Sequence, residues 1–398
     1  MDLEPTDEQA ALRDELRRFL ESRVTPEARR ACADRPGAVD RHLWRALAEM
    51  GVFSLTVPEA SGGVGLGWAD AVLVAEELGR AAVPGPVVAT ALAAALLGGR
   101  LDDHAGGPAA VARAGSESGP ADGPGSGSGL PGGSGSGSGL PGGSGPGSGL
   151  PGGSGPGSGI AGLPGGAASG EVVVGVVDDA APALVEHLAG LDQLVVLEGD
   201  SVRLLDAPTV LAGAAALPRP LDPLTPVHRV PRLDGGTPVG DAAAAATWRR
   251  TGSLLTAALQ VGLGEGALQL ATAYAKERRQ FGREIGSFQS LKHLLADAHT
   301  AVEVARSAVW SAAVVLDEAL AAPSAVAVAG GEVDWAVAAA RIVAGAASVG
   351  SGKTCVQVHG GMGYTWELDA HLFLKRALVL DTAFGSADAA IDVLAATL

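Results

Sequence analysis

The chain has 398 residues, of which 47% are hydrophobic and 18% charged, so it can bury a large core and lies outside the composition of disordered proteins. Its formal charge is −16. A nucleic acid is therefore not expected as a partner, because phosphate binding depends on clustered Lys and Arg.

The start of the chain and its apolar runs give expectations about its surroundings. Residues 1–5 contain two acids and no basic segment, so we expect no secretory signal and a cytoplasmic location. The apolar run from Val87 to Leu97 is much shorter than the roughly 20 residues that cross a bilayer, so no membrane insertion is expected. Cys32 and Cys355 lie far apart without metal-ligand spacing, which predicts neither a disulfide nor a metal site.

Residues 1–104 are predicted to form a helical domain. Thr6 to Gln9 has the form of a capping box, and apolar residues follow it at helical spacing. Gly79 is placed to end the third helix. The further helices are expected at His42 to Met50, Trp68 to Leu78 and Val87 to Leu97.

Residues 105–170 are predicted to be a flexible tether. Gly, Ser and Pro dominate the segment, and one apolar residue recurs every ten positions, at Leu130, Leu140, Leu150 and Ile160. One apolar side chain in ten cannot offset an ordering cost of about 1–2 kcal/mol per residue. As a random coil, roughly 50 such residues would span on the order of 40 Å.

Residues 171–240 are predicted to be a small, reduced β domain, and residues 241–398 a helical bundle. Gly199 and Asp200 form a turn between two of the short Val- and Leu-rich strands. The strands are expected at Glu171 to Val177, Leu194 to Leu197 and Val202 to Leu205. The bundle helices are expected at Ala243 to Arg278, Phe288 to Leu320, Val333 to Val358, and Asp369 to the C-terminus. Short connections predict an antiparallel four-helix bundle, and hence a mainly α protein with a small β middle domain.

Two segments of the bundle are candidates for ligand contacts. The segment from Tyr274 to Gln289 places basic residues at a helix end, where they also suit the helix dipole. The segment from Gln357 to Tyr364 has three glycines in four positions, which lets backbone amides approach a ligand. His359 within it is more typical of a structural histidine than of a ligand.

Together these segments, about 70 residues apart in one bundle, resemble the C-terminal domain of the acyl-CoA dehydrogenase family. The stretch from Met50 to Gly65, followed by Ala75 to Gly79, resembles that family's first helical domain. The resemblance covers about three fifths of the chain and implies a flavoprotein that oxidises an acyl-CoA thioester to the 2-enoyl-CoA. It also implies FAD as the cofactor, an oligomer, and an electron-transfer protein as acceptor.

The resemblance assigns cofactor contacts to six residues. Arg278 corresponds to the arginine that contacts the FAD pyrophosphate across a subunit boundary, and guanidinium suits phosphate oxygens. Phe281 and Gln289 correspond to contacts with the adenosine side. The remaining three form the turn that the partner's FAD approaches: Gln357, Gly360 and Gly361.

The catalytic base that the resemblance implies is missing. An α-proton of a thioester needs a carboxylate to remove it. Phe384 stands where many members have that Glu, and the position used by other members lies near Gly252 and Ser253. Asp381 is a weak substitute, and Asp388, Glu265 and Glu367 are weaker, so the base is left unassigned.

The middle region departs from the family as well, because the segments that hold the flavin ring have no counterpart. Such losses resemble a subunit of the divided, heterotetrameric actinobacterial acyl-CoA dehydrogenases, in which two unlike chains share each site. The leading hypothesis is a subunit that contributes a half-site for FAD. The alternatives are a non-catalytic structural or regulatory homologue without flavin and, less favoured, a relative of flavin oxidases.

Overall fold

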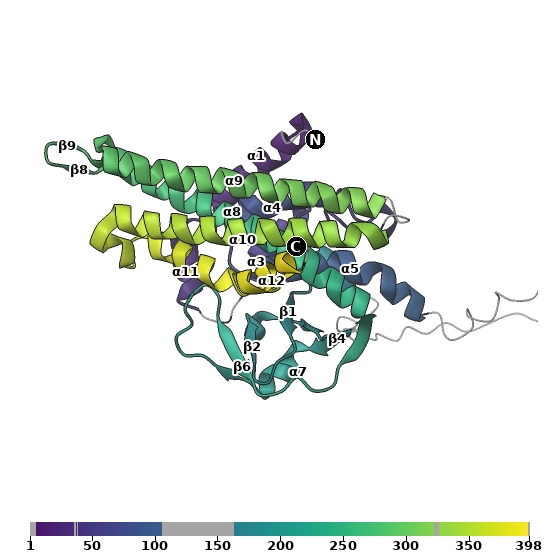
Figure 1. The fold of residues 1–398 in the computed structure, drawn as a ribbon. Helices are drawn as coiled ribbons and strands as arrows, with labels where there is room; N and C mark the ends of the chain where they lie inside the picture. The colour runs from purple at the N-terminus through teal and green to yellow at the C-terminus, as the bar shows by residue number, and fades with distance from the viewer. Residues whose placement is uncertain (1–4, 36, 38, 106–162, 322–325, 397–398) are drawn as a thin grey trace, which may run out of the picture.

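The computed structural model describes residues 5–35, 37, 39–105, 163–321 and 326–396. Helices at both ends of the chain lie over a small β region, as Figure 1 shows. This confirms the predicted mainly α fold with a β middle part and a C-terminal helical bundle. The N-terminal helices are α1 (Asp7–Arg23), α2 (Pro26–Ala33), α3 (Arg41–Glu49), the short 3-10 helix η1 (Glu59–Ser61), α4 (Trp68–Arg80) and α5 (Val87–Ala105).

The N-terminal helices begin where the sequence predicts. Thr6 caps α1, and the reciprocal hydrogen bonds with Gln9 form the predicted capping box. The helix α2, which begins with Pro26 at its first position, was not predicted. The start of α4 is capped from another element, because Gly67 lacks a side chain: the Asp317 carboxylate accepts from the backbone N–H groups of Trp68 and Ala69 at 2.8 and 2.9 Å.

The prediction that Gly79 ends its helix is wrong, since α4 continues through it to Arg80. Gly79 instead allows close contact with the long helix α8 (Ala242–Glu277). A Cβ at Gly79 would come closer than 3.0 Å to the Leu259 carbonyl, and one at Gly262 equally close to the Glu76 carbonyl. The two backbones therefore touch where α4 crosses α8.

Ion pairs add to this contact between the N-terminal helices and the bundle. Arg306 on α9 (Gln289–Ala321) binds Glu76 of α4 at 2.7 Å and Glu265 of α8 at 2.6 Å. Arg17 of α1 binds Glu77, which is 1% exposed. Because these pairs are partly buried, they fix how the helices meet more than exposed pairs would.

The predicted tether lies mostly outside the described residues, in the segment 106–162. Its last part is helical rather than part of a tether. Residues Leu163–Ala168 form α6, with Leu163 and Ala167 buried. These two apolar side chains enter the hydrophobic core.

The middle region contains two sheets. One has the strand order β1-β3-β4-β7 and the other the order β2-β6-β5. The Gly199-Asp200 turn joins β3 and β4 as predicted, while β7 extends the region beyond the Pro-rich stretch. The strands are β1 (Val174–Asp178), β2 (Ala183–Glu186), β3 (Gln193–Leu197), β4 (Ser201–Asp206), β5 (Ala215–Ala216), β6 (Val227–Val230) and β7 (Thr237–Asp241), with η3 (Leu188–Gly190) and α7 (Ala207–Ala212) between them.

The C-terminal bundle follows the prediction except at its end. The predicted last helix is two helices, because Phe384 and Gly385 between them adopt positive φ angles of 52° and 100°, which a helix cannot contain. The elements are α8, the hairpin β8 (Arg279–Gln280) and β9 (Arg283–Glu284), η4 (Ile285–Ser287), α9, α10 (Val326–His359), η6 (Gly360–Tyr364), α11 (Ala370–Leu380) and α12 (Ala387–Ala395).

The helices α8 and α10 are also long and apolar enough to cross a membrane, by length and composition. Of the apolar window in α8, 78% is buried inside the protein, and in α10 half is buried. Both helices pack side by side in the bundle, which accounts for their apolar character.

Substituting Gly79 tests the contact between α4 and α8. Gly79→Ala is expected to lower the free energy of unfolding by about 1–3 kcal/mol, because the new methyl group overlaps a backbone carbonyl. Gly350→Ala, on the exposed side of α10 with no atom within 4 Å, is the matched control and should be neutral or stabilising by up to about 1 kcal/mol. Chemical denaturation measures both, and equal effects would contradict the assigned contact.

Candidate functional site

A cavity of about 650 Å³ lies where the three parts of the chain meet. Its walls come from α4 and α5, from strands of the middle region, from α8, and from α11 with the turn that follows it. Most lining side chains are apolar, which is typical of sites that bind small organic ligands. The polar lining side chains are Asp178, Glu186, His187, Arg219, Asp222, Thr225, Thr256, Arg376 and Thr382.

The turn between α11 and α12 forms one wall of the cavity and is held by Arg341 of α10. This side chain is fully buried, and its guanidinium donates to the carbonyls of Leu380 at 2.5 Å and Ala383 at 3.2 Å. It also binds the side-chain oxygen of Gln260 on α8. Burial lowers the pKa of Arg341 to about 10. The turn is therefore fixed to two bundle helices through one cation.

Phe384 of this turn and Gly252 of α8, the two positions that the resemblance implies for the base, lie against each other. The Phe384 ring lies where a Cβ on Gly252 would be, closer than 3.0 Å. Phe384 lines the cavity and is half-buried, and Gly252 is buried. An aromatic ring packed on a glycine therefore stands where the resemblance implies a carboxylate.

None of the four substitute carboxylates considered from the sequence lines the cavity. Asp381 lies against Gly345 of α10, since a Cβ placed on Gly345 would be 2.8 Å from the Oδ1 atom of Asp381. Glu265 is bound in the ion pairs with Arg306 and Arg17. Asp388 and Glu367 are exposed.

A group of titratable residues does line the cavity. Arg376 of α11 is 6% exposed, and its Nε lies 3.7 Å from a carboxylate oxygen of the fully buried Asp222. Glu186 of β2 lies near both: burial and the Asp222 charge raise its pKa, Arg376 opposes them, and the result is about 7. His187 is buried, which lowers its pKa to about 3 and keeps it neutral.

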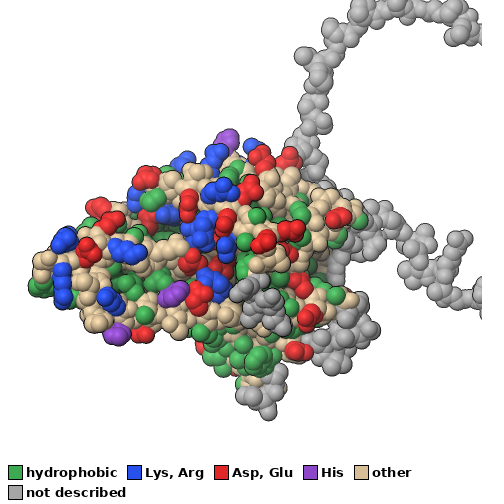
Figure 2. Space-filling model, turned by 90° about the horizontal axis from the view of Figure 1, so that it is seen from above, with side chains coloured by type: hydrophobic (Ala, Val, Ile, Leu, Met, Phe, Trp, Pro, Cys, Tyr) green, Lys and Arg blue, Asp and Glu red, His purple; other side chains and the backbone are tan. Residues whose placement is uncertain are grey.

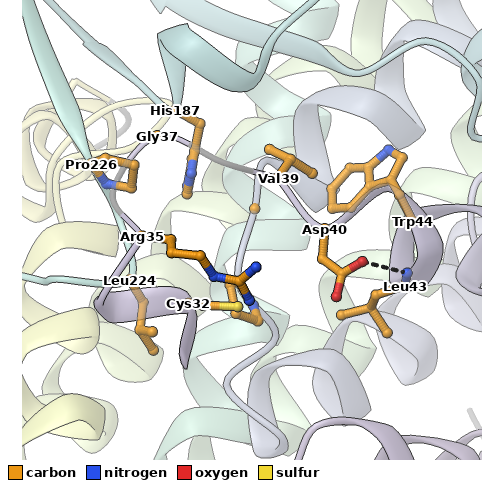
Figure 3. Close-up of a pocket in the computed structure, with 12 residues that line it drawn as sticks. Cys32, Arg35, Gly37, Val39, Asp40, Leu43, Trp44, His187, Leu224 and Pro226 are labelled. Atoms are coloured by element: carbon orange, nitrogen blue, oxygen red, sulfur yellow. Dashed lines mark hydrogen bonds between the residues drawn. The ribbon is translucent and has the colours of Figure 1, made fainter. Parts of the chain in front are cut away.

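His187 also separates this cavity from a second, much smaller pocket of about 20 Å³. Figure 3 shows His187 pointing towards Cys32 and Arg35 from the N-terminal helices. The dashed line there is the hydrogen bond from the Leu43 backbone N–H to the Asp40 carboxylate. Room for about one water molecule makes this pocket a domain contact rather than a ligand site.

The structure brings the six predicted cofactor residues to one end of the bundle. Tyr274 near the end of α8 stacks on His359 at the end of α10, with ring centroids 4.3 Å apart. His359 is 4% exposed, its Nδ1 lies 2.7 Å from the Cys355 carbonyl, and its Nε2 is buried without a partner among the described residues. This stack joins the hairpin, which carries Arg278 and Phe281, to the turn of Gly360 and Gly361.

This end of the bundle is exposed. The Phe281 ring is 92% accessible, and Arg278, Gln289 and Gln357 are also exposed. Figure 2 shows blue Lys and Arg side chains at the left end of the molecule, where Figure 1 places the hairpin. Around Gly360 and Gly361 no atom lies within 4 Å of a Cβ position, so a ligand can approach their backbone. The hairpin lies away from the β region. Within one copy of the chain, the residues at this end of the bundle are therefore separate from the residues that line the cavity.

Sequence reasoning missed the residues that shape the cavity. Arg341 and Glu186 are single full charges in apolar segments, and Arg376 follows Lys375 in another such segment. Charges in apolar segments are the signal that could have identified these residues, because charged side chains are rarely buried without a functional or structural role. Their proximity depends on three segments far apart in sequence. Periodicity alone could not bring them together.

The fold and these motifs define a family. Residues 6–102 match the family model of the acyl-CoA dehydrogenase N-terminal domain, and residues 245–398 match that of the C-terminal domain. Acyl-CoA dehydrogenase IpdE2 of Mycolicibacterium smegmatis is 30% identical over 377 residues, which cover 94% of this chain and 93% of that protein. The chain therefore belongs to the acyl-CoA dehydrogenase family.

A further relative and two solved structures are also similar to this chain. Acyl-CoA dehydrogenase FadE34 of Mycobacterium tuberculosis is 31% identical over 94% of this chain and 45% of its own length. A chain of the ChsE4-ChsE5 complex of Mycobacterium tuberculosis superposes with a TM-score of 0.69 at 23% identity, covering 100% of this chain and 98% of its own. Butyryl-CoA dehydrogenase of Megasphaera elsdenii gives a TM-score of 0.70 at 17% identity, covering 100% and 99% of the two chains. These structural likenesses concern the fold.

A double-mutant cycle tests the contact of Phe384 with Gly252. Gly252→Ala should destabilise the chain by about 1–3 kcal/mol, because its methyl group overlaps the ring. Phe384→Ala removes the ring, so the two changes should couple by at least about 1 kcal/mol in the free energy of unfolding. Additive effects would contradict the contact.

The pKa of Glu186 predicts a pH effect on stability. A carboxyl group whose pKa is raised on folding contributes stability fully at pH values below its ordinary pKa of 4.5. This contribution is lost as the pH rises through the folded-state pKa of about 7. Glu186→Gln should therefore raise the melting temperature at about pH 8 and change it little at about pH 5. His187, Asp222 and Arg376 face Glu186 and are present in both proteins. A shift that is the same at both pH values would contradict the raised pKa.

Proposed function

We propose that the chain is a subunit of an FAD-dependent acyl-CoA dehydrogenase that converts an acyl-CoA thioester to the 2-enoyl-CoA in the cytoplasm. The observation that carries this proposal is the exposed end of the bundle, where arginine, aromatic and glycine residues of two separate motifs meet. Family membership supports the class of reaction, and an electron-transfer protein is the expected acceptor.

The residues at the bundle end fit the phosphate and adenosine parts of FAD. Arg278 has a free planar guanidinium for the pyrophosphate, since no hydrogen bond to it is found in the described residues. Phe281 and Gln289 would contact the adenosine, and Gln357, Gly360 and Gly361 would offer an open backbone surface. Bound flavin would supply the hydride acceptor. Because the hairpin lies away from this chain's own cavity, we infer that it serves a flavin seated mainly in another chain.

The proposal assigns the base to a second chain. Phe384 and Gly252 leave this chain without a carboxylate at either family position, and the exposed Phe281, Tyr364 and Trp366 suit burial in an interface. The likeness to a chain of the ChsE4-ChsE5 complex supports a partner of unlike sequence. In such an assembly this chain holds the nucleotide end of FAD, and its partner removes the α-proton.

A non-catalytic homologue without flavin is the second candidate. The Phe384 ring on Gly252 favours it, since this contact excludes a carboxylate from the turn. The open surface beside Gly360 and Gly361, at the same end of the bundle as the exposed Arg278, favours the flavin subunit, because a purely structural turn has no need of it.

Purification of the chain alone and with an adjacently encoded acyl-CoA dehydrogenase chain distinguishes the two candidates. Flavin absorbance and acyl-CoA-dependent reduction of an electron acceptor are the measurements. We expect both in the mixture, together with a hetero-oligomer by light scattering. Absence of flavin and turnover from every combination would overturn the proposal in favour of the non-catalytic homologue.

Arg278→Ala tests the contact to the pyrophosphate. Loss of a charge-assisted hydrogen bond of about 1.5–3 kcal/mol should weaken FAD binding roughly tenfold or more. The matched control is Arg232→Ala, an exposed arginine of the middle region that pairs with Asp234 and should leave FAD content unchanged. If the two variants retained FAD equally, the role assigned to Arg278 would be wrong.

A further inference from the structure

The cavity of this chain contains a buried cation that the proposed function does not use. The Arg376 guanidinium makes no hydrogen bond to any described residue, and its Nη1 is buried without a partner. Its nearest counter-ion, Asp222, lies 3.7 Å away from Nε, beyond hydrogen-bond distance. A guanidinium has five N–H donors and no acceptor, so it needs acceptor atoms around it. A ligand that brings an oxygen would satisfy donors that the protein leaves free.

The neighbours of Arg376 determine whether the ligand oxygen should be neutral or negatively charged. Asp222 is already engaged, because it accepts from the Thr225 hydroxyl at 2.6 Å and the Leu224 N–H at 3.0 Å, and its charge balances Arg376. Glu186 has no hydrogen-bond partner in the described part of the chain, and near neutral pH a large share of it is protonated, so it offers an O–H donor. The cluster is thus close to neutral and rich in donors.

The rest of the cavity suits a ligand whose main part is apolar. Leucine, valine, alanine and proline dominate the walls, including Val83, Val87, Val176, Leu184, Leu259 and Leu380. A carboxylate would add a second negative charge beside Asp222, whereas a neutral oxygen would not. We propose that this chain's own cavity binds an acyl group that carries a neutral carbonyl or hydroxyl oxygen on its carbon chain, held by Arg376 and Glu186.

This proposal goes beyond the half-site for FAD, because it concerns the cavity of this chain and needs no base. The cavity would bind its ligand without desaturating it. The test therefore uses the full chain alone, without flavin or a second chain. Isothermal calorimetry measures binding of hexanoyl-CoA, of its ketone analogue acetylbutyryl-CoA, and of adipoyl-CoA, which carries a carboxylate.

We expect acetylbutyryl-CoA to bind about tenfold more tightly than hexanoyl-CoA, since a site built for an oxygen disfavours the analogue that lacks it. Arg376→Met should reduce that ratio to about one. Lys375→Met, the adjacent residue of α11 that does not line the cavity, should leave the ratio unchanged. Arg376→Lys keeps a cation beside Asp222 and should retain part of the preference if the methionine variant does not fold.

Three outcomes would overturn the inference. The first is equal binding of hexanoyl-CoA and acetylbutyryl-CoA, or no binding of either. The second is an equal loss of affinity for all three esters in Arg376→Met, which would assign Arg376 to the thioester carbonyl that they share. The third is a preference for adipoyl-CoA. Each would leave the proposed function intact, because that function is tested by flavin and turnover in the mixture of two chains.

Discussion

The hold of Arg341 on the turn after α11 is the interaction on which the chemistry of the cavity depends. One buried guanidinium donates to the carbonyls of Leu380, Ala383 and Gly385 and to the amide oxygen of Gln260, so the turn cannot move without leaving buried donors unsatisfied. The positive φ angle of Phe384 then directs its ring onto Gly252. A carboxylate at either position would need a different packing of this turn.

Two separate regions follow from the same bundle. At its exposed end, the Tyr274–His359 stack aligns the hairpin with the glycine turn, and arginine and aromatic side chains are exposed there. In the cavity near the β region, a nearly neutral cluster of Arg376, Asp222 and Glu186 lies among apolar side chains. We propose the first region for contact with a shared cofactor and the second for a ligand held by this chain alone.

Much of the fold could be predicted from the sequence, and particular residues show why. Thr6 and Gln9 predict the start of α1, because capping is a local interaction. The motif around Arg278 indicated the family. Gly79 was misread, since a glycine at a helix end and a glycine at a helix crossing look alike until the crossing partner is known. The break at Phe384 was missed because nothing local opposes a helix there except Gly385.

The site was less predictable than the fold, because its residues are also brought together only by tertiary packing. Asp381 lies three residues from Phe384, but the helix turns it towards Gly345 and away from the cavity. Arg376, Asp222 and Glu186 come from three elements, and only the folded chain brings them together. Burial then sets the protonation of Glu186, which no sequence pattern encodes.

Exchange of the α-hydrogen of a bound acyl-CoA with deuterated water tests the central claim most directly, because it reports the base without requiring hydride transfer. The account predicts no deuterium uptake above the buffer rate with this chain alone, measured by mass spectrometry, and rapid uptake once the second chain is added. Rapid uptake by this chain alone would contradict it, and would mean that a carboxylate of its own cavity removes the proton.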